Sequence, residues 1–297
     1  MPSRRAESGR ISTGFGPSAG RVELPWRGPG PGRPELPVPP GPMPLRAHGQ
    51  TRKRWRYVGV FGEELMLCAA RAQVGPLGQS FWVLWDRRHR ERLDHTSFRP
   101  GSGEVTMDGA RLEIDARRLR ASLRLGESTA IESICPSGAG WGWTRKRAGV
   151  PVSGTIEAGD RRWEVDALAV DDESAGYHRR HTSWRWSAGV GAAEDGRRVA
   201  WNLVEGINDP PEESERAIWV DGEPYEPEPV FFQGEAGIEF AAGARLSFAE
   251  ECERARNENL LLVSSRYRHR FCRFHGSLDG LELAEGLGVM EEHDARW

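Results

Sequence analysis

Lysine is nearly absent from this sequence: Lys53 and Lys146 are the only lysines among 41 basic residues, so arginine supplies almost all of the positive charge. This skew is better explained by a GC-rich genome than by a ligand. Acidic residues number 44, and the formal net charge is -3. A nucleic-acid-binding domain usually concentrates a marked basic excess on one face. The composition therefore argues against nucleic acid as a partner.

Cysteine is also scarce. The sequence contains no Cys-x-x-Cys pair and no histidine near a cysteine at zinc-finger spacing, so it indicates neither a structural metal nor a disulfide framework. We expect reduced, buried thiols at the four positions, which are Cys68, Cys135, Cys252 and Cys272.

Long hydrophobic runs and common catalytic motifs are missing too. No apolar run approaches the roughly 20 residues that span a bilayer, and no apolar segment follows the first residues as in a signal peptide. We therefore expect a cytoplasmic protein without a membrane span. Serine-hydrolase, zinc-protease, kinase and nucleotide-binding signatures are absent. Nothing in the sequence indicates a cofactor or an oligomeric state.

Proline and glycine dominate the first part of the chain. Residues 1–49 contain runs such as Pro29-Gly30-Pro31-Gly32 and few apolar side chains to offset the entropy of ordering. We predict a disordered tail over residues 1–49.

The rest of the sequence has the period of two that is typical of strands. Large apolar residues alternate along 54–60, and the pattern recurs about a dozen times with turn signals every eight to fifteen residues. Only residues 248–257 suggest a short helix, with glutamates on an exposed face. Many short strands favour barrels or sandwiches over a βαβ sheet. We predict an all-β fold of two consecutive antiparallel β-barrel or sandwich units, at residues 50–150 and 151–297.

The densest group of chemically capable side chains lies between Asp171 and Trp186. Trp184 and Trp186 share one face of a strand, either in a core or along a cavity wall. A histidine here could transfer protons if its pKa and reach allowed it. His-x-His and Glu-x-x-His pairs are absent, which disfavours a metal. The candidates in this stretch are Tyr177, His178, His181, Trp184 and Trp186.

Two further stretches carry candidates. Trp141 and Trp143 share a face beside Lys146, and could either bind a ligand or belong to a solvated strand edge. Trp201 and Asn202 precede Glu205, which could serve as a proton donor if it were buried among the tryptophans, since an apolar pocket raises a carboxyl pKa. A rim carboxylate in water is the alternative.

From about residue 33 to 297 the chain resembles a bacterial family known only as domain of unknown function 2804. The resemblance rests on ordered matches, among them residues 53–59, Gly140-Trp141-Gly142-Trp143, Ser183-Trp184-Arg185-Trp186-Ser187 and residues 201–206. Membership in this family implies no established activity.

More distantly, the chain is similar to tandem lipocalin-like proteins that include carotenoid 1,2-hydratases and AttH-like proteins. This similarity implies two β-barrel units and a closing strand, whose counterpart here is Gly286-Leu287-Gly288-Val289-Met290-Glu291. In the hydratases an acid protonates a double bond beside aromatic rings. This chain departs from their Trp-x-Asp-His signature, with Tyr177-His178-Arg179-Arg180-His181 at that place, so the catalytic acid does not transfer.

Three functions stay open at this point. The favoured hypothesis is a tandem β-barrel protein that binds a lipophilic small molecule in an aromatic-lined pocket, either as a carrier or as an enzyme on a lipid or isoprenoid. In the enzyme, Glu205 or His181 would donate the proton, and a buried acid would lie at the base of the pocket. The third hypothesis is a scaffold that binds protein through a sheet edge.

Overall fold

The computed structural model describes residues 23–29, 32–98, 103–260 and 263–296. Within these ranges all paired strands are antiparallel, and the one helical element is the 3₁₀ turn η1 (Gly234–Ala236). The all-β prediction is confirmed. No helix among the described residues is long and apolar enough to cross a membrane.

The first sheet follows the order β7-β6-β5-β4-β13-β12-β10-β9-β8, with β11 and then β1 attached to the other half of β12. Its far end curls back, because β8 contacts β5 and β6. Its strands are β1 (Trp26–Gly28), β4 (Lys53–Phe61), β5 (Leu65–Val74), β6 (Leu77–Asp86), β7 (Glu91–Ser97), β8 (Val105–Asp108), β9 (Arg111–Ala116), β10 (Leu119–Leu125), β11 (Ile131–Ser137), β12 (Gly140–Ala158) and β13 (Arg161–Gly176).

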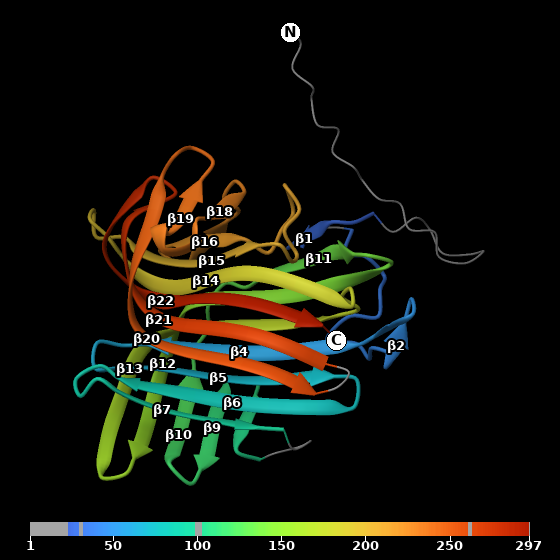
Figure 1. Cartoon of the computed structure of the whole chain (residues 1–297). Coiled ribbons are helices and arrows are strands. Elements are labelled where there is room, and N and C mark those ends of the chain that lie inside the picture. The colour runs from blue at the N-terminus through green and yellow to red at the C-terminus, as the bar shows by residue number, and fades with distance from the viewer. Residues whose placement is uncertain (1–22, 30–31, 99–102, 261–262, 297) are drawn as a thin grey trace.

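The second sheet follows the order β17-β16-β15-β14-β22-β21-β20-β19-β18, and its strands β14, β15 and β22 lie above β5, β6 and β7 of the first sheet in Figure 1. A separate two-stranded sheet pairs β2 (Arg46–Ala47) with β3 (Gln50–Thr51). The strands of the second sheet are β14 (His181–Ala193), β15 (Arg198–Glu205), β16 (Ala217–Val220), β17 (Glu223–Tyr225), β18 (Val230–Phe232), β19 (Ile238–Phe240), β20 (Arg245–Leu260), β21 (Val263–Leu278) and β22 (Leu281–Arg296).

Strands β4, β5 and β6 are buried on both faces over about half of their length. Along β4, Val58 and Val60 belong to the core inside the first sheet, while Tyr57 and Phe61 belong to a second core between the two sheets. The alternation follows the period of two. On the opposite side of this shared core lie residues of β14, β15, β21 and β22. The region between the sheets is therefore packed largely by side chains that alternate along single strands.

Three sequence predictions need correction. Residues 248–257 belong to β20, because pairing with β21 along its whole length outweighs their local helical pattern. The boundary expected at residue 150 falls inside β12, and the first sheet continues to Gly176. The expected tail does not extend to residue 49, because Leu24, Trp26 and other apolar residues of this segment are buried against β11 and β12. Residues 1–22 and 30–31 of that tail lie outside the described residues.

Candidate functional site

A cavity of about 190 Å³ lies between the two sheets, beside the shared core. Its walls come from β4, β5 and β6 of the first sheet and from β14 and β20–β22 of the second. Leu77 and Phe98 also line it, and both are exposed, so the mouth is apolar. A concave, mostly apolar space with a few polar groups is the usual form of a small-molecule site.

Aromatic rings from both sheets form the walls. Trp55 and Tyr57 share one face of β4, and Trp184 and Trp186 share one face of β14, because residues two apart on a strand point the same way. Trp55 and Trp184 are stacked, with ring centroids 6.2 Å apart and planes 5° apart. Tyr57 contacts Trp186 edge to face at 5.2 Å. The aromatic contacts thus join β4 to β14.

Glu291 is one of the acids that line the cavity. It lies opposite Trp186 in the β14–β22 register and accepts a hydrogen bond of 2.9 Å from Trp184 Nε1. Burial raises its pKa to about 7, although hydrogen bonds from Trp184 and Tyr267 oppose the shift. A carboxyl with this pKa exchanges its proton near neutral pH.

A second polar group borders the cavity at β12 and β13. Lys146 Nζ forms ion pairs with Asp172 Oδ1 at 2.7 Å and Glu215 Oε1 at 3.2 Å. Lys146 and Asp172 are direct cross-strand partners, which explains their closeness. Burial lowers the pKa of Lys146, but the two carboxylates outweigh burial and raise it. Burial, with help from Asp172, raises the pKa of Glu215. One lysine therefore faces two carboxyl groups.

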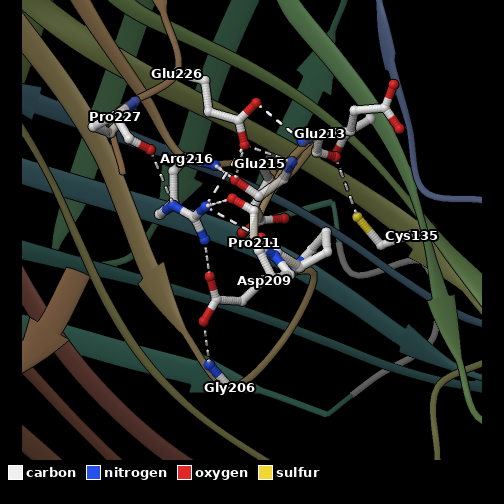
Figure 2. Close-up of polar contacts among 12 residues, drawn as sticks. Cys135, Gly206, Asp209, Pro211, Glu213, Glu215, Arg216, Glu226 and Pro227 are labelled. Carbon is white, nitrogen blue, oxygen red and sulfur yellow. Dashed lines mark hydrogen bonds and ion pairs between the residues drawn. The ribbon is translucent and has the colours of Figure 1, made fainter. Parts of the chain in front are cut away.

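Glu215 reaches the cavity from the loop between β15 and β16, which is organised around the buried side chain of Arg216 (Figure 2). Arg216 pairs with Asp209 and donates hydrogen bonds to the carbonyl oxygens of Pro210 and Pro211, at 3.1 and 3.0 Å. Arg27 of β1 also donates to the carbonyl oxygen of Arg216, at 2.9 Å. The N-terminal segment thus helps to hold the loop that carries Glu215.

His269 lies behind the cavity wall and contacts Tyr57, which lines the cavity. The Tyr57 hydroxyl lies 3.1 Å from Nε2 of His269, whose pKa burial lowers to about 3. His269 is therefore neutral at physiological pH. Within the described ranges, no group of three or more histidine, cysteine, aspartate or glutamate side chains is placed to hold a metal ion.

The structure brings only some of the predicted residues to the cavity. Trp184, Trp186 and Lys146 line it. Asn202 lies behind the wall, where its Oδ1 accepts from Trp186 Nε1 at 2.8 Å and its Nδ2 donates to the carbonyl oxygen of Glu215 at 2.8 Å. Asn202 therefore links an aromatic wall residue to the polar group.

Other predicted ligand residues belong to separate cores. Trp141, Trp143 and Tyr177 pack against the N-terminal segment, and Tyr177 donates to the carbonyl oxygen of Pro44 at 2.7 Å. Trp201 occupies the interior of the second sheet, in the space that a side chain at Gly189 would need.

His178 lies behind Trp55, with ring centroids 5.3 Å apart, and is not among the residues that line the cavity. Burial and the neighbouring Lys53 lower its pKa to about 3.

Neither predicted proton donor lines the cavity. Glu205 lies at the surface, where it pairs with Arg185 at 3.3 Å, and its side chain is 34% exposed. His181 is 53% exposed and its Nε2 lies 2.8 Å from Asp294 Oδ2. The buried acids that do line the cavity are Asp172, Glu215 and Glu291.

Sequence reasoning missed Trp55, Tyr57, Tyr267 and Glu291 as site residues. A signal existed for Glu291, since it ends the Gly286–Glu291 segment that resembles the closing strand of tandem lipocalin-like proteins. Trp55 and Tyr57 stood in an alternating strand, but nothing in the sequence told which of its faces meets the second sheet. Asp172 and Glu215 become neighbours only through the fold.

Comparisons with solved structures find the same lipocalin-like all-β fold. Kievitone hydratase from Nectria haematococca is 9% identical, with a TM-score of 0.51, over 81% of this chain and 88% of that chain. An AttH-like protein from Nitrosomonas europaea is 13% identical, with a TM-score of 0.48, over 86% and 98%. CghA is 11% identical, with a TM-score of 0.42, over 82% and 88%. At these identities the likeness concerns the fold alone.

Comparison with curated proteins gave no match. A family model described as Domain of unknown function (DUF2804) matches residues 104–297, which cover most of both sheets and the strands β12–β14 and β20–β22 around the cavity. The chain therefore belongs to the DUF2804 family.

Proposed function

We propose that this protein binds a compact lipophilic molecule in the cavity between its two sheets. The observation that carries the proposal is the cavity wall, where aromatic rings of β4, β14 and β21 face a space with an apolar mouth. Burial of apolar ligand surface against such rings is favourable, at about 25 cal/mol per Å². Because both sheets contribute to the wall, aromatic rings from both lie at the cavity rather than inside the core of one sheet.

The proposal is tested on the purified protein by native mass spectrometry and organic extraction, followed by titration with fatty acids, isoprenoids and quinols. Tryptophan fluorescence reports binding, since Trp55, Trp184 and Trp186 line the cavity. We expect a lipophilic compound to shift or quench this emission with saturation. A protein that is empty and indifferent to the whole panel and to aromatic ammonium compounds contradicts the proposal and favours the scaffold hypothesis.

A matched pair of variants on β5 locates the binding. Ala72 lines the cavity, whereas the neighbouring Arg71 is exposed on the other face of the strand. We expect Ala72→Leu to weaken binding at least about tenfold by filling the cavity, and Arg71→Leu to leave it unchanged. Equal binding by wild type and Ala72→Leu would place the ligand elsewhere.

A second candidate function is proton transfer to the bound molecule, and one observation favours it. Glu291 is buried at the cavity wall with a pKa raised to about 7, so it carries a proton over much of the neutral range. A general acid works best when its pKa lies near the operating pH. In an enzyme, Glu291→Gln should abolish the conversion of an identified ligand during incubation, followed by chromatography as well as mass, because an isomerisation leaves the mass unchanged. A ligand that is bound but never altered by wild type argues for a carrier.

A further inference from the structure

Acidic side chains outnumber basic ones among the residues that line the cavity between the sheets. Arg254 and Arg256 both line it, but each has a carboxylate partner: Arg254 pairs with Asp94 at 3.5 Å, and Arg256 with Glu258 at 3.1 Å. Lys146 is shared by Asp172 and Glu215.

Glu291 forms no ion pair in the part of the chain that the structure describes. Lys146 acts on it through space, but Lys146 already pairs with Asp172 and Glu215. The hydrogen-bond partners of Glu291 are the Trp184 indole N–H and the Tyr267 side chain, and only 7% of the residue is exposed. Burying an ionised carboxylate without an ion-pair partner costs free energy. The described part of the protein supplies no such partner to Glu291. A ligand of positive charge would supply one.

The aromatic side chains of the cavity wall also favour a positively charged ligand. The face of an aromatic ring is the negative end of its quadrupole and attracts cations within about 6 Å. The protein already uses this attraction beside the cavity, where the guanidinium carbon of Arg254 lies 4.6 Å from the Phe81 ring centroid and 5.8 Å from that of Tyr267. Rings and surplus carboxylate together select for a cation more strongly than either does alone.

We propose that the molecule bound between the sheets carries a positively charged group, a protonated amine or quaternary ammonium, on an apolar body, with the charge beside Glu291. This inference rests on the proposed ligand-binding function and specifies its ligand class. The cavity of about 190 Å³ sets the size. An apolar cavity of about 150 Å³ accommodates benzene, so one ring with a small cationic head fits here.

The test compares two probes of the same shape, phenyltrimethylammonium and its uncharged carbon analogue tert-butylbenzene, by tryptophan fluorescence and calorimetry. We expect the cation to bind at least about tenfold more tightly to the wild-type protein. Glu291→Gln should remove most of this preference. Glu285→Gln, which removes a charge from an exposed position of the same strand, should keep it.

The wild type supplies an independent measurement in case Glu291→Gln fails to fold. The preference for the cation should grow between pH 6 and pH 8 as Glu291 ionises, and a preference that is constant or falls overturns the inference. Equal or tighter binding of tert-butylbenzene overturns the inference but leaves the proposed lipophilic pocket standing. If neither probe binds and no molecule is extracted, the pocket proposal fails as well.

The groups that face Glu291 set this pH profile and have to be included in its interpretation. Among the described residues they include Tyr57, Cys68, Lys146, Asp172, Glu215, Arg254, Tyr267 and His293. Burial lowers the pKa of His293 to about 4, so it stays neutral across the tested range. Burial and neighbouring acids raise the pKa of Tyr267 well above its usual value, so it stays protonated.

Discussion

Glu291 affects the stability of the protein as well as its ligand binding. Its pKa rises from 4.5 to about 7 on folding, because burial disfavours the ionised form. The folded protein therefore holds this proton more tightly than the unfolded chain does. Between about pH 4.5 and pH 7 the stability contributed by Glu291 must fall as pH rises, since the native state binds more protons in that window.

We expect Glu291→Gln to flatten this part of the pH–stability profile. At pH 8 the variant should unfold at higher urea concentration than the wild type, by a difference that corresponds to roughly 3 kcal/mol at most. Urea unfolding at a series of pH values measures the effect. Glu285→Gln serves as the control and should follow the wild-type slope. Parallel profiles for wild type and Glu291→Gln would show that the carboxyl is not buried as described.

Single residues were predictable only as far as strand periodicity reaches. The spacing placed Trp184 and Trp186 on one face, and both line the cavity. The same rule applied to Trp141 and Trp143, yet these pack beneath the N-terminal segment. Periodicity tells which residues share a face but not what that face contacts. Only the register between β14 and β22 brings Glu291 beside these rings.

The carboxylate of Glu251 on β20 binds side chains of both sheets. Glu251 accepts hydrogen bonds from Trp85 Nε1 at 3.0 Å, from Arg87 at 2.8 Å and from Arg273 Nε at 2.7 Å. Burial acts to raise its pKa, but the hydrogen bonds from Arg87, Trp85 and Arg273 outweigh burial and lower the pKa to about 2. This carboxylate thus links the first sheet to the second.

The lowered pKa of Glu251 makes its contribution sensitive to acid. The contribution is fully present above about pH 4.5 and is lost as pH falls toward 2, because the folded state holds the ionised form more tightly. We expect Glu251→Gln to be less stable than wild type at pH 6 and to show a weaker loss of stability between pH 4.5 and pH 2.5. Thermal melts followed by circular dichroism measure both effects. The control is Glu250→Gln, an exposed neighbour, and a Glu251→Gln profile that matches this control would refute the role.

At the scale of the elements, the strands themselves could be predicted from the sequence more readily than the pairing between them. Strands β9 and β10 carry a clear signal in the sequence, because half-exposed strands alternate between apolar and polar residues. Strand β5 carries no such signal, because Leu65-Met66-Leu67-Cys68-Ala69 is buried on both faces and has no alternation. In β20, many charged residues gave a helical pattern that only the pairing with β21 overrides. Pairing between distant segments is the information that a single sequence conveys least.

At the scale of the whole molecule, residues 23–29 and 32–49, the described part of the N-terminal segment, belong to the fold. Leu24, Trp26, Val38 and Met43 are buried with Trp141 and Trp143, and β1 pairs with β11. This segment contains few apolar residues, but most of those that it has pack against apolar side chains of β11 and β12. Low average hydrophobicity therefore did not predict the state of residues 23–49.

We expect Trp26→Ala to lower the free energy of unfolding by about 3–5 kcal/mol, the usual effect of removing a large buried ring. Leu45→Ala in the same segment should change it by no more than about 0.5 kcal/mol, because Leu45 is exposed. Chemical denaturation measures both. A Trp26→Ala variant as stable as Leu45→Ala would mean that the segment contributes little.

The core shared by the two sheets has a consequence for how the chain can be divided. Tyr57, Phe61 and Met66 of one sheet and Trp186 and Phe271 of the other are buried together. One sheet ends and the next begins at residues 177–180. Cutting the chain there would leave each half with a large exposed apolar surface. The two sheets are in this sense one folding unit, and each half expressed alone should be insoluble, whereas the halves produced together should assemble.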